Sequence, residues 1–200
     1  MAWTFAPKPR ACSRPRPRTG GRPRPEGDAV AVRRQLLIGL FPTANVRAEI
    51  LAHREDWWWP RGCTLSAAQG LHLTLYYLPD HQGEAEQRLR DTLARVPMPP
   101  LELTLDSSGT WRNDISVVRP AAHDGLREFH DALTCALRQA GFISYARGWT
   151  PHVTIARKSE RAACPGQLPP IHWTVREFRL VRSHFTHPFR HELLDAYPAC

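Results

Sequence analysis

Two short segments contain residues that can transfer protons and bind anions. They read Leu-His-Leu-Thr-Leu and Pro-His-Val-Thr-Ile, so that His72 precedes Thr74 and His152 precedes Thr154. Side chains along a strand alternate between its two faces. Each histidine is therefore expected to share a face with its threonine, while the apolar residues between them point to the core. Two such strands that face each other would bring two imidazoles and two hydroxyls to one cleft.

This set of groups suits the hydrolysis of a phosphodiester. A neutral imidazole can take a proton from water while a protonated one gives a proton to the leaving oxygen, and histidine titrates near neutral pH. Threonine hydroxyls can donate hydrogen bonds to the phosphate oxygens as charge builds there. We therefore expect no metal. The chain also lacks the G-x-x-x-x-G-K and G-x-G-x-x-G patterns, so no nucleotide cofactor is expected. A strained cyclic phosphate is an attractive substrate.

The pattern alone does not identify the catalytic pair. Ten histidines and thirteen threonines in 200 residues would give fewer than one His-x-Thr by chance, whereas four occur, and the other two begin at His172 and His184. Surface histidines or hydrogen-bonded core histidines remain the alternative interpretation for each. The spacing of His184, His187 and His191 is compatible with metal ligands. We expect instead that they are ordinary histidines of a turn and a strand, because nothing nearby completes a tetrahedral ligand set.

The elements that would position these residues alternate along the chain. Strands are expected at 35–41, 71–78, 101–105, 115–118, 151–157, 173–181 and 191–197. Helices are expected after an N-cap at Thr43, over 84–96, and from a cap at Asp124 to a stop at Gly141. Since strands outnumber the crossovers, we predict an α+β fold with mostly antiparallel sheets. Each half holds a helix and then a His-x-Thr strand, which suggests two similar lobes.

Charge divides the chain into a tail and a domain. The formal net charge is +8, and residues 1–28 hold seven of the 27 basic residues in Arg-Pro repeats that exclude a helix or a central strand. We predict a disordered basic tail over 1–28 and one two-lobed domain over 29–200. The tail either tethers RNA through salt-dependent contacts or is a dispensable extension, even a start-codon error.

Composition indicates a cytoplasmic globular protein. Five scattered cysteines without a C-x-x-C pair indicate reduced thiols, and the N-terminus has no apolar segment of a secretory signal. No apolar run is long enough to span a membrane. We expect a monomer that does not contact membranes.

The two segments, the second extended to Pro-His-Val-Thr-Ile-Ala-Arg, are similar to the paired HxTx motifs of the 2H phosphoesterase superfamily. Within it the chain resembles the 2′–5′ RNA ligase, or RNA 2′,3′-cyclic phosphodiesterase, family (LigT/ThpR-like). The resemblance covers about residues 33–198, and it includes the opening strand 35–42 and the closing segment 173–183. It implies two lobes of antiparallel sheet and helices around a central cleft.

The resemblance implies roles for individual residues. The catalytic pair would be His72 and His152, with phosphate contacts from Thr74, Thr154 and Arg157. In that family the first histidine is the usual acid and the second the usual base, whereas the residues themselves assign neither role. The expected reaction leaves a 2′-phosphate on RNA, with 2′–5′ ligation as a side activity.

Two further points concern the substrate. Trp149 either stacks on a base or packs in the core. The family's usual Phe-Leu-Gly-Glu after the first motif is replaced by a segment that begins at Tyr77 and ends at Asp80, which bears on substrate choice. The alternatives to RNA ends are a small cyclic nucleotide or an ADP-ribose cyclic phosphate, or a non-catalytic RNA-binding protein.

Overall fold

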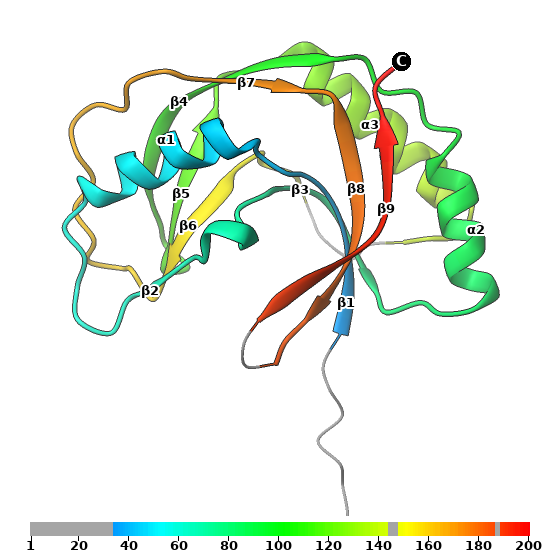
Figure 1. Cartoon of the computed structure of the whole chain (residues 1–200), viewed down its shortest axis with the longest axis horizontal. Helices are drawn as coiled ribbons and strands as arrows, with labels where there is room; N and C mark the ends of the chain where they lie inside the picture. Colours follow the sequence, from blue (N-terminus) through cyan, green and yellow to red (C-terminus); the bar gives the residue numbers. More distant parts are fainter. Residues whose placement is uncertain (1–33, 144–147, 187–188) are drawn as a thin grey trace, which may run out of the picture. The chain divides into compact units, whose positions relative to one another are not determined.

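The computed structural model describes residues 34–143, 148–186 and 189–200 (Figure 1). Residues 32–200 form one compact unit. The predicted tail over residues 1–28 lies outside the described residues, and so does His187.

The described residues of this unit form nine strands and three α-helices. The strands are β1 (Arg34–Leu40), β2 (Thr64–Leu65), β3 (Leu73–Pro79), β4 (Leu101–Trp111), β5 (Ile115–Pro120), β6 (Val153–Arg157), β7 (Ile171–Val175), β8 (Glu177–His184) and β9 (Arg190–Pro198). The helices are α1 (Ala44–Glu55), α2 (Glu84–Leu93) and α3 (Asp124–Gln139), with one 3-10 turn at Ala68–Gly70. The sequence missed the two shortest elements, β2 and the 3-10 turn, and the break between β7 and β8.

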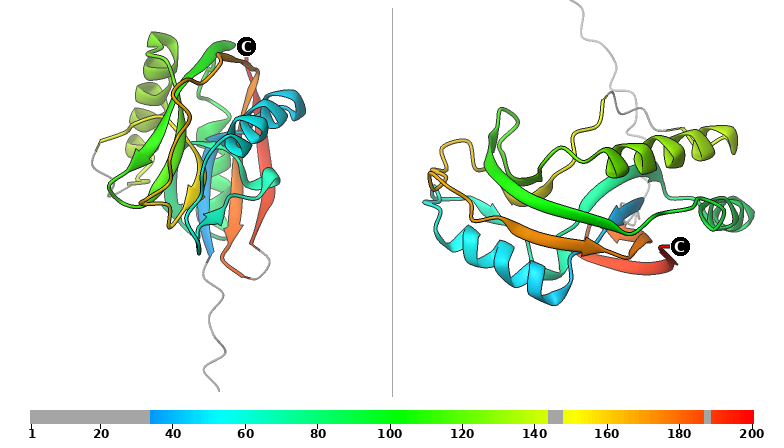
Figure 2. Two further views of the ribbon diagram at one scale, coloured as in Figure 1. Left: turned by 90° about the vertical axis from the view of Figure 1, so that its left-hand side faces the viewer. Right: turned by 90° about the horizontal axis from the view of Figure 1, so that it is seen from above.

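All strand pairs in the described part of the chain are antiparallel, which confirms the α+β class. The strands of both lobes join in one sheet with the order β7-β4-β5-β6-β3-β1-β8-β9, and β2 pairs with β6. The two lobes meet where β3 pairs with β6, through Leu73 opposite Val153. Helices α2 and α3 lie side by side, apart from α1, which contacts β7 (Figures 1 and 2).

Local sequence explains the helix boundaries. The Thr43 hydroxyl caps α1, because it accepts a hydrogen bond from the backbone N–H of Val46 at 3.5 Å. The cap of α3 is His123 rather than the predicted Asp124, since the His123 Nδ1 accepts from the N–H of Leu126 at 3.0 Å. Gly141 follows that helix with a φ of +85°, the left-handed conformation in which glycine ends helices.

The strand predicted over 173–181 is two strands. The strand breaks at Arg176. Before the break, β7 pairs with β4; after it, β8 pairs with β1 and β9. This stretch therefore passes from the end strand β7 to β8, the second strand from the other end of the sheet, and periodicity alone does not reveal such a crossing.

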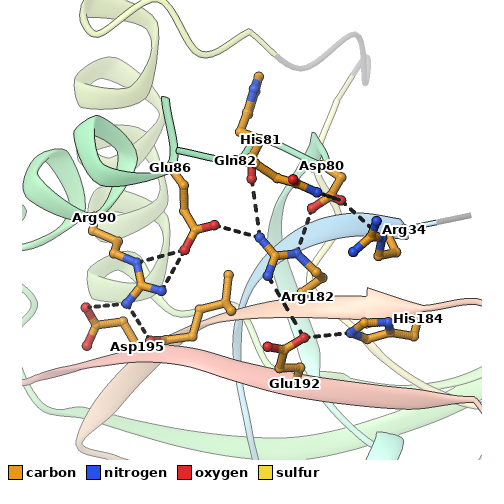
Figure 3. Close-up of polar contacts among 11 residues, drawn as sticks. Arg34, Asp80, His81, Gln82, Glu86, Arg90, Arg182, His184, Glu192 and Asp195 are labelled. Atoms are coloured by element: carbon orange, nitrogen blue, oxygen red, sulfur yellow. Dashed lines mark hydrogen bonds and ion pairs between the residues drawn. The ribbon is translucent and has the colours of Figure 1, made fainter. Parts of the chain in front are cut away.

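An ion-pair network around Arg182 fixes β8 and β9 against α2 (Figure 3). The guanidinium donates to Asp80 at 2.7 Å and to Glu86 at 2.6 Å. Glu86 also accepts a hydrogen bond from the Arg90 guanidinium at 2.6 Å. The Glu192 carboxylate lies 2.7 Å from the Nε2 of His184. The Arg182 side chain is 11% exposed, so these charge-assisted hydrogen bonds compensate a cation that has lost most of its water.

Two further features concern the whole unit. No helix in the described ranges has the length and apolar character required to cross a bilayer. Four of the five cysteines lie in these ranges as unpaired thiols.

Candidate active site

The antiparallel register between β3 and β6 brings the two His-x-Thr segments together. Leu73 lies opposite Val153, and both side chains are fully buried. Extending this register by one residue in each direction places His72 opposite Thr154 and Thr74 opposite His152. Residues directly and diagonally opposite on one face of a sheet are near neighbours. The two imidazoles and two hydroxyls therefore lie on one face, related by a local two-fold axis through the Leu73–Val153 pair.

A β-bulge follows each motif threonine. In β6, Thr154 pairs with Val117 and Ala156 with Ser116, so Ile155 is the extra residue. In β3, the residue directly after the motif threonine is again the extra one: Gly39 pairs with Thr74 and Ile38 with Tyr76, which leaves Leu75 unpaired. A bulge shifts the alternation of side chains by one residue. Residues three positions after each threonine consequently return to the face of the histidines.

Arg157 reaches the site for this reason. It stands three residues after Thr154, and simple alternation would have placed it on the opposite face. Its charge lowers the pKa of both His72 and His152, as expected for a guanidinium close to both imidazoles. It is exposed and has no carboxylate partner among the described residues. The arrangement leaves its donors available for an anion.

Both imidazoles are held by the same backbone contact. The Nδ1 of His72 lies 2.7 Å from the carbonyl oxygen of Gly70, and the Nδ1 of His152 lies 2.8 Å from that of Thr150. A carbonyl oxygen only accepts hydrogen bonds, so Nδ1 carries the proton in each ring. The Nε2 atoms then remain for exchange of a proton with a substrate, as in other acid–base histidines.

Burial and nearby cations favour the neutral form of both rings. Desolvation, the charge of His191 and, more weakly, those of His152 and Arg157 lower the pKa of His72 to about 4, although its bond to Gly70 opposes this. Desolvation likewise lowers the pKa of His152, with a further contribution from Arg157. A bound phosphate would supply the anion that this site lacks and would raise both values.

Trp149, for which the sequence left both packing and base stacking open, packs against its neighbours in the structure. Its ring stacks on His130 of α3 with a centroid distance of 3.8 Å and an interplanar angle of 4°. Its indole N–H donates to the backbone carbonyl of Thr74 at 2.9 Å. Trp149 thus links α3 to the first motif strand.

Several aromatic residues that the sequence did not indicate surround the imidazoles. The ring of Trp111 lies 4.5 Å from that of His152, and the rings of Phe41 and His191 lie 5.5 and 5.1 Å from that of His72. Phe41 is the last residue of the predicted first strand, but nothing in that prediction points it at the imidazoles. The position of His191 beside His72 depends on the pairing of β8 with β9, which no sequence pattern reveals.

Of the other histidines that the sequence singled out, His172 lies away from the imidazole pair, whereas His191 lies beside His72. His172 lies on β7 with its Nδ1 3.4 Å from the Thr104 hydroxyl, far along the sheet order from β3. His184 bonds to Glu192 and His191 to Ser183, at 2.7 and 3.0 Å. Within the described ranges, no three His, Cys, Asp or Glu side chains group as a metal site would require.

Residues 46–185 match the family model of the 2'-5' RNA ligase superfamily. The chain belongs to this superfamily. The resemblance seen in the HxTx motifs is therefore confirmed at the level of the family, and the chain is a 2H phosphoesterase.

Named relatives of the superfamily agree with this assignment. The chain is 28% identical over 160 residues to the RNA 2',3'-cyclic phosphodiesterase of Escherichia coli (strain K12), covering 76% of this chain and 88% of the relative. The crystal structure of E. coli LigT complexed with 3'-AMP superposes with a TM-score of 0.75 at 26% identity, over 83% of this chain and 98% of that one. A protein of Thermus thermophilus, TT0787, shares the fold, with a TM-score of 0.63 at 24% identity over 82% of this chain and 97% of that one.

Proposed function

We propose that the protein hydrolyses 2′,3′-cyclic phosphate ends of RNA to 2′-phosphates, with His72 and His152 as the acid–base pair. The observation that carries the proposal is the matched placement of the two imidazoles. Each is anchored through Nδ1 to the carbonyl two residues earlier, and the two lie across one antiparallel pair. The kinship to an RNA 2',3'-cyclic phosphodiesterase supports the choice of substrate.

The reaction follows from these groups. The Nε2 of one neutral imidazole takes a proton from water as the water oxygen attacks phosphorus. The bond from phosphorus to the ribose O3′ breaks, and the other imidazole, protonated, gives its proton to that oxygen. The 2′-phosphate remains, and proton exchange with solvent restores both rings. Thr74, Thr154 and Arg157 would donate hydrogen bonds to the non-bridging oxygens, where negative charge grows.

The same displacement accounts for a ligase side activity. If the 5′-hydroxyl of a second RNA attacks in place of water, O3′ leaves in the same way and a 2′–5′ phosphodiester forms. No additional group is required, because the base takes the proton of the hydroxyl as it would take that of water.

Exposed aromatic rings beside the first imidazole favour a nucleic-acid end over a small cyclic phosphate. The ring of Phe189 lies 4.9 Å from that of His191, whose ring is 5.1 Å from His72. Phe189 and Phe185 are 44% and 48% exposed, and their rings are 5.6 Å apart. Aromatic side chains bind single strands by stacking on bases. We therefore expect higher kcat/KM for an oligonucleotide with a 2′,3′-cyclic phosphate than for the mononucleotide.

Single substitutions at the two imidazoles test the proposal. His72→Ala and His152→Ala should each lower turnover of a cyclic-phosphate RNA in chelator at least about 100-fold, because each removes a positioned proton transfer. His172→Ala is the matched control: it also breaks a His-x-Thr, but on β7, and should leave turnover unchanged. Circular dichroism checks the fold of each variant.

Other outcomes would redirect the proposal. RNA binding without hydrolysis would indicate a non-catalytic RNA-binding protein. Faster turnover of a mononucleotide or of an ADP-ribose cyclic phosphate than of the oligonucleotide would keep the chemistry but move the substrate to small molecules.

A further inference from the structure

The bulge in β3 brings a residue to the site that the HxTx motif does not include. Leu75 is the extra residue of this bulge, so Tyr77 shares the face of Thr74. The two adjacent tyrosines take opposite sides: Tyr76 is 7% exposed and packs in the core, whereas Tyr77 is 37% exposed. Tyr77 therefore presents its ring on the surface that holds the imidazoles.

A hydrogen bond ties Tyr77 to the motif. The Thr74 hydroxyl donates to the phenolic oxygen of Tyr77, with 3.3 Å between the two oxygens. A threonine hydroxyl has one proton, and here that proton is engaged by Tyr77. In the protein without substrate, the free proton of the pair is therefore the one on the phenol, and a bound phosphate would replace Tyr77 as the acceptor of the Thr74 proton. An anion that approaches this side of the site meets the Tyr77 hydroxyl as a donor.

The position of Tyr77 corresponds to that of Arg157 in the second lobe. Each stands three residues after its motif threonine and follows a bulge at the residue directly after that threonine. The local two-fold axis through Leu73 and Val153 therefore relates the two side chains across the site. One lobe supplies a cation and the other a neutral hydroxyl, both of which can donate to an oxyanion.

We propose that the Tyr77 hydroxyl binds a non-bridging oxygen of the substrate phosphate, as the counterpart of Arg157. This inference rests on the proposed phosphodiesterase function, and it adds to it a substrate-binding residue on the side of the first lobe. Tyr77 transfers no proton to or from the substrate. It holds the phosphate between the two imidazoles and stabilises the charge that grows on the oxygen.

Tyr77→Phe tests this role while it keeps the ring. We expect kcat/KM for a cyclic-phosphate RNA to fall about tenfold, the effect of one lost hydrogen bond to a charged group. We also expect inhibition by inorganic phosphate to weaken by a similar factor. The matched control is Tyr76→Phe, which removes the neighbouring hydroxyl, 3.4 Å from the carbonyl oxygen of Phe142, on the other face. That variant should keep the kcat/KM and the phosphate inhibition of the wild type.

The outcomes separate this inference from the proposed function. A Tyr77→Phe variant with the kcat/KM and phosphate inhibition of an active wild type would overturn the role of Tyr77 alone. A wild type that hydrolyses no cyclic phosphate would overturn the proposed function. In that case, titration of inorganic phosphate into the wild type and Tyr77→Phe still decides whether this hydroxyl binds the anion. Equal affinities would reject it.

Discussion

At the scale of residues, the site is governed by the loss of water around two imidazoles. His72 and His152 are both half-buried, and burial is the largest cause of the lowered pKa of each. Their Nδ1 contacts with backbone carbonyls work in the opposite direction and fix the tautomer. The free enzyme is therefore neutral at both rings near pH 7, and the anionic substrate provides the charge that favours protonation of one of them.

The pH dependence of kcat/KM follows from these shifts. Catalysis requires one imidazole protonated and the other neutral, and the diester substrate itself does not titrate in this range. The rate should therefore peak between the two apparent pKa values of the pair, one about 4 and the other below 6.5. Measurements from pH 3.5 to 9 check this. A kcat/KM that keeps rising above pH 7 would contradict the proposed protonation states.

His191 contributes to this balance from outside the motif. Its ring lies edge-on to that of His72, and its charge is the second cause of the low pKa there. The same burial lowers the pKa of His191 itself. His191 is therefore neutral at neutral pH, and its charge opposes protonation of His72 only at the acidic pH at which both rings take up protons.

At the scale of elements, the sequence shows which strands carry the chemistry but not how they bend. Alternation correctly places His72 with Thr74 and His152 with Thr154, because the apolar residues between them are buried in the core. Arg157 was assigned by resemblance, and alternation alone would place it on the face opposite His152. A one-residue bulge leaves no trace in hydrophobic periodicity, since Ile155 and Ala156 are both buried and either could be the extra residue.

The parts that depend on strand pairing were also beyond the sequence. The split of 173–181 places its first part in the end strand β7 and its second part in β8, which lies next to β9 at the other end of the strand order. His191 comes next to His72 only because β9 pairs with β8 and β8 with β1. Contacts between strands distant in the chain depend on packing rather than on local propensity.

The Arg182 network is the main polar support of the β8–β9 hairpin (Figure 3). Arg182→Met should lower the free energy of unfolding by about 2–4 kcal/mol at pH 7, because it leaves Asp80 and Glu86 without their shared cation. Chemical denaturation measures this. Arg176→Met, at the exposed break between β7 and β8, is the control and should change stability by less than about 0.5 kcal/mol.

At acidic pH, the difference in free energy of unfolding between the wild type and Arg182→Met should disappear. Desolvation opposes ionisation of Asp80, but hydrogen bonds from Arg182 and Gln82 lower its pKa overall. Hydrogen bonds from Arg90 and Arg182 likewise lower the pKa of Glu86 against desolvation. Carboxylates with lowered values stabilise the fold above their ordinary pKa and lose this contribution as the pH falls through the lowered one. A deficit of Arg182→Met that persists undiminished at pH 2 would contradict this origin.

At the scale of the whole molecule, the chemistry and the excess charge occupy different parts of the chain. The proposed catalytic residues lie between His72 and Arg157, whereas residues 1–28 hold seven of the 27 basic residues. We predict that deletion of residues 1–28 leaves kcat on a cyclic mononucleotide unchanged. Loss of turnover or of folding would show that the domain begins earlier than residue 29.

The same deletion tests whether the tail contacts RNA. Each phosphate contact with a single strand adds about 0.7 to the slope of log affinity against log salt concentration. Binding of an oligonucleotide should therefore become weaker and less dependent on salt when the tail is removed. Equal slopes for the two proteins would show that the extension is dispensable.

The most direct test of the central claim follows the phosphorus atom itself. Wild-type protein is incubated in chelator with an RNA that ends in a 2′,3′-cyclic phosphate, and ³¹P NMR identifies the product. The paired imidazoles predict conversion to the 2′-phosphate alone in the wild type, with no conversion by His72→Ala or His152→Ala on the same timescale. A 3′-phosphate product, or turnover that survives the loss of either imidazole, would contradict the account.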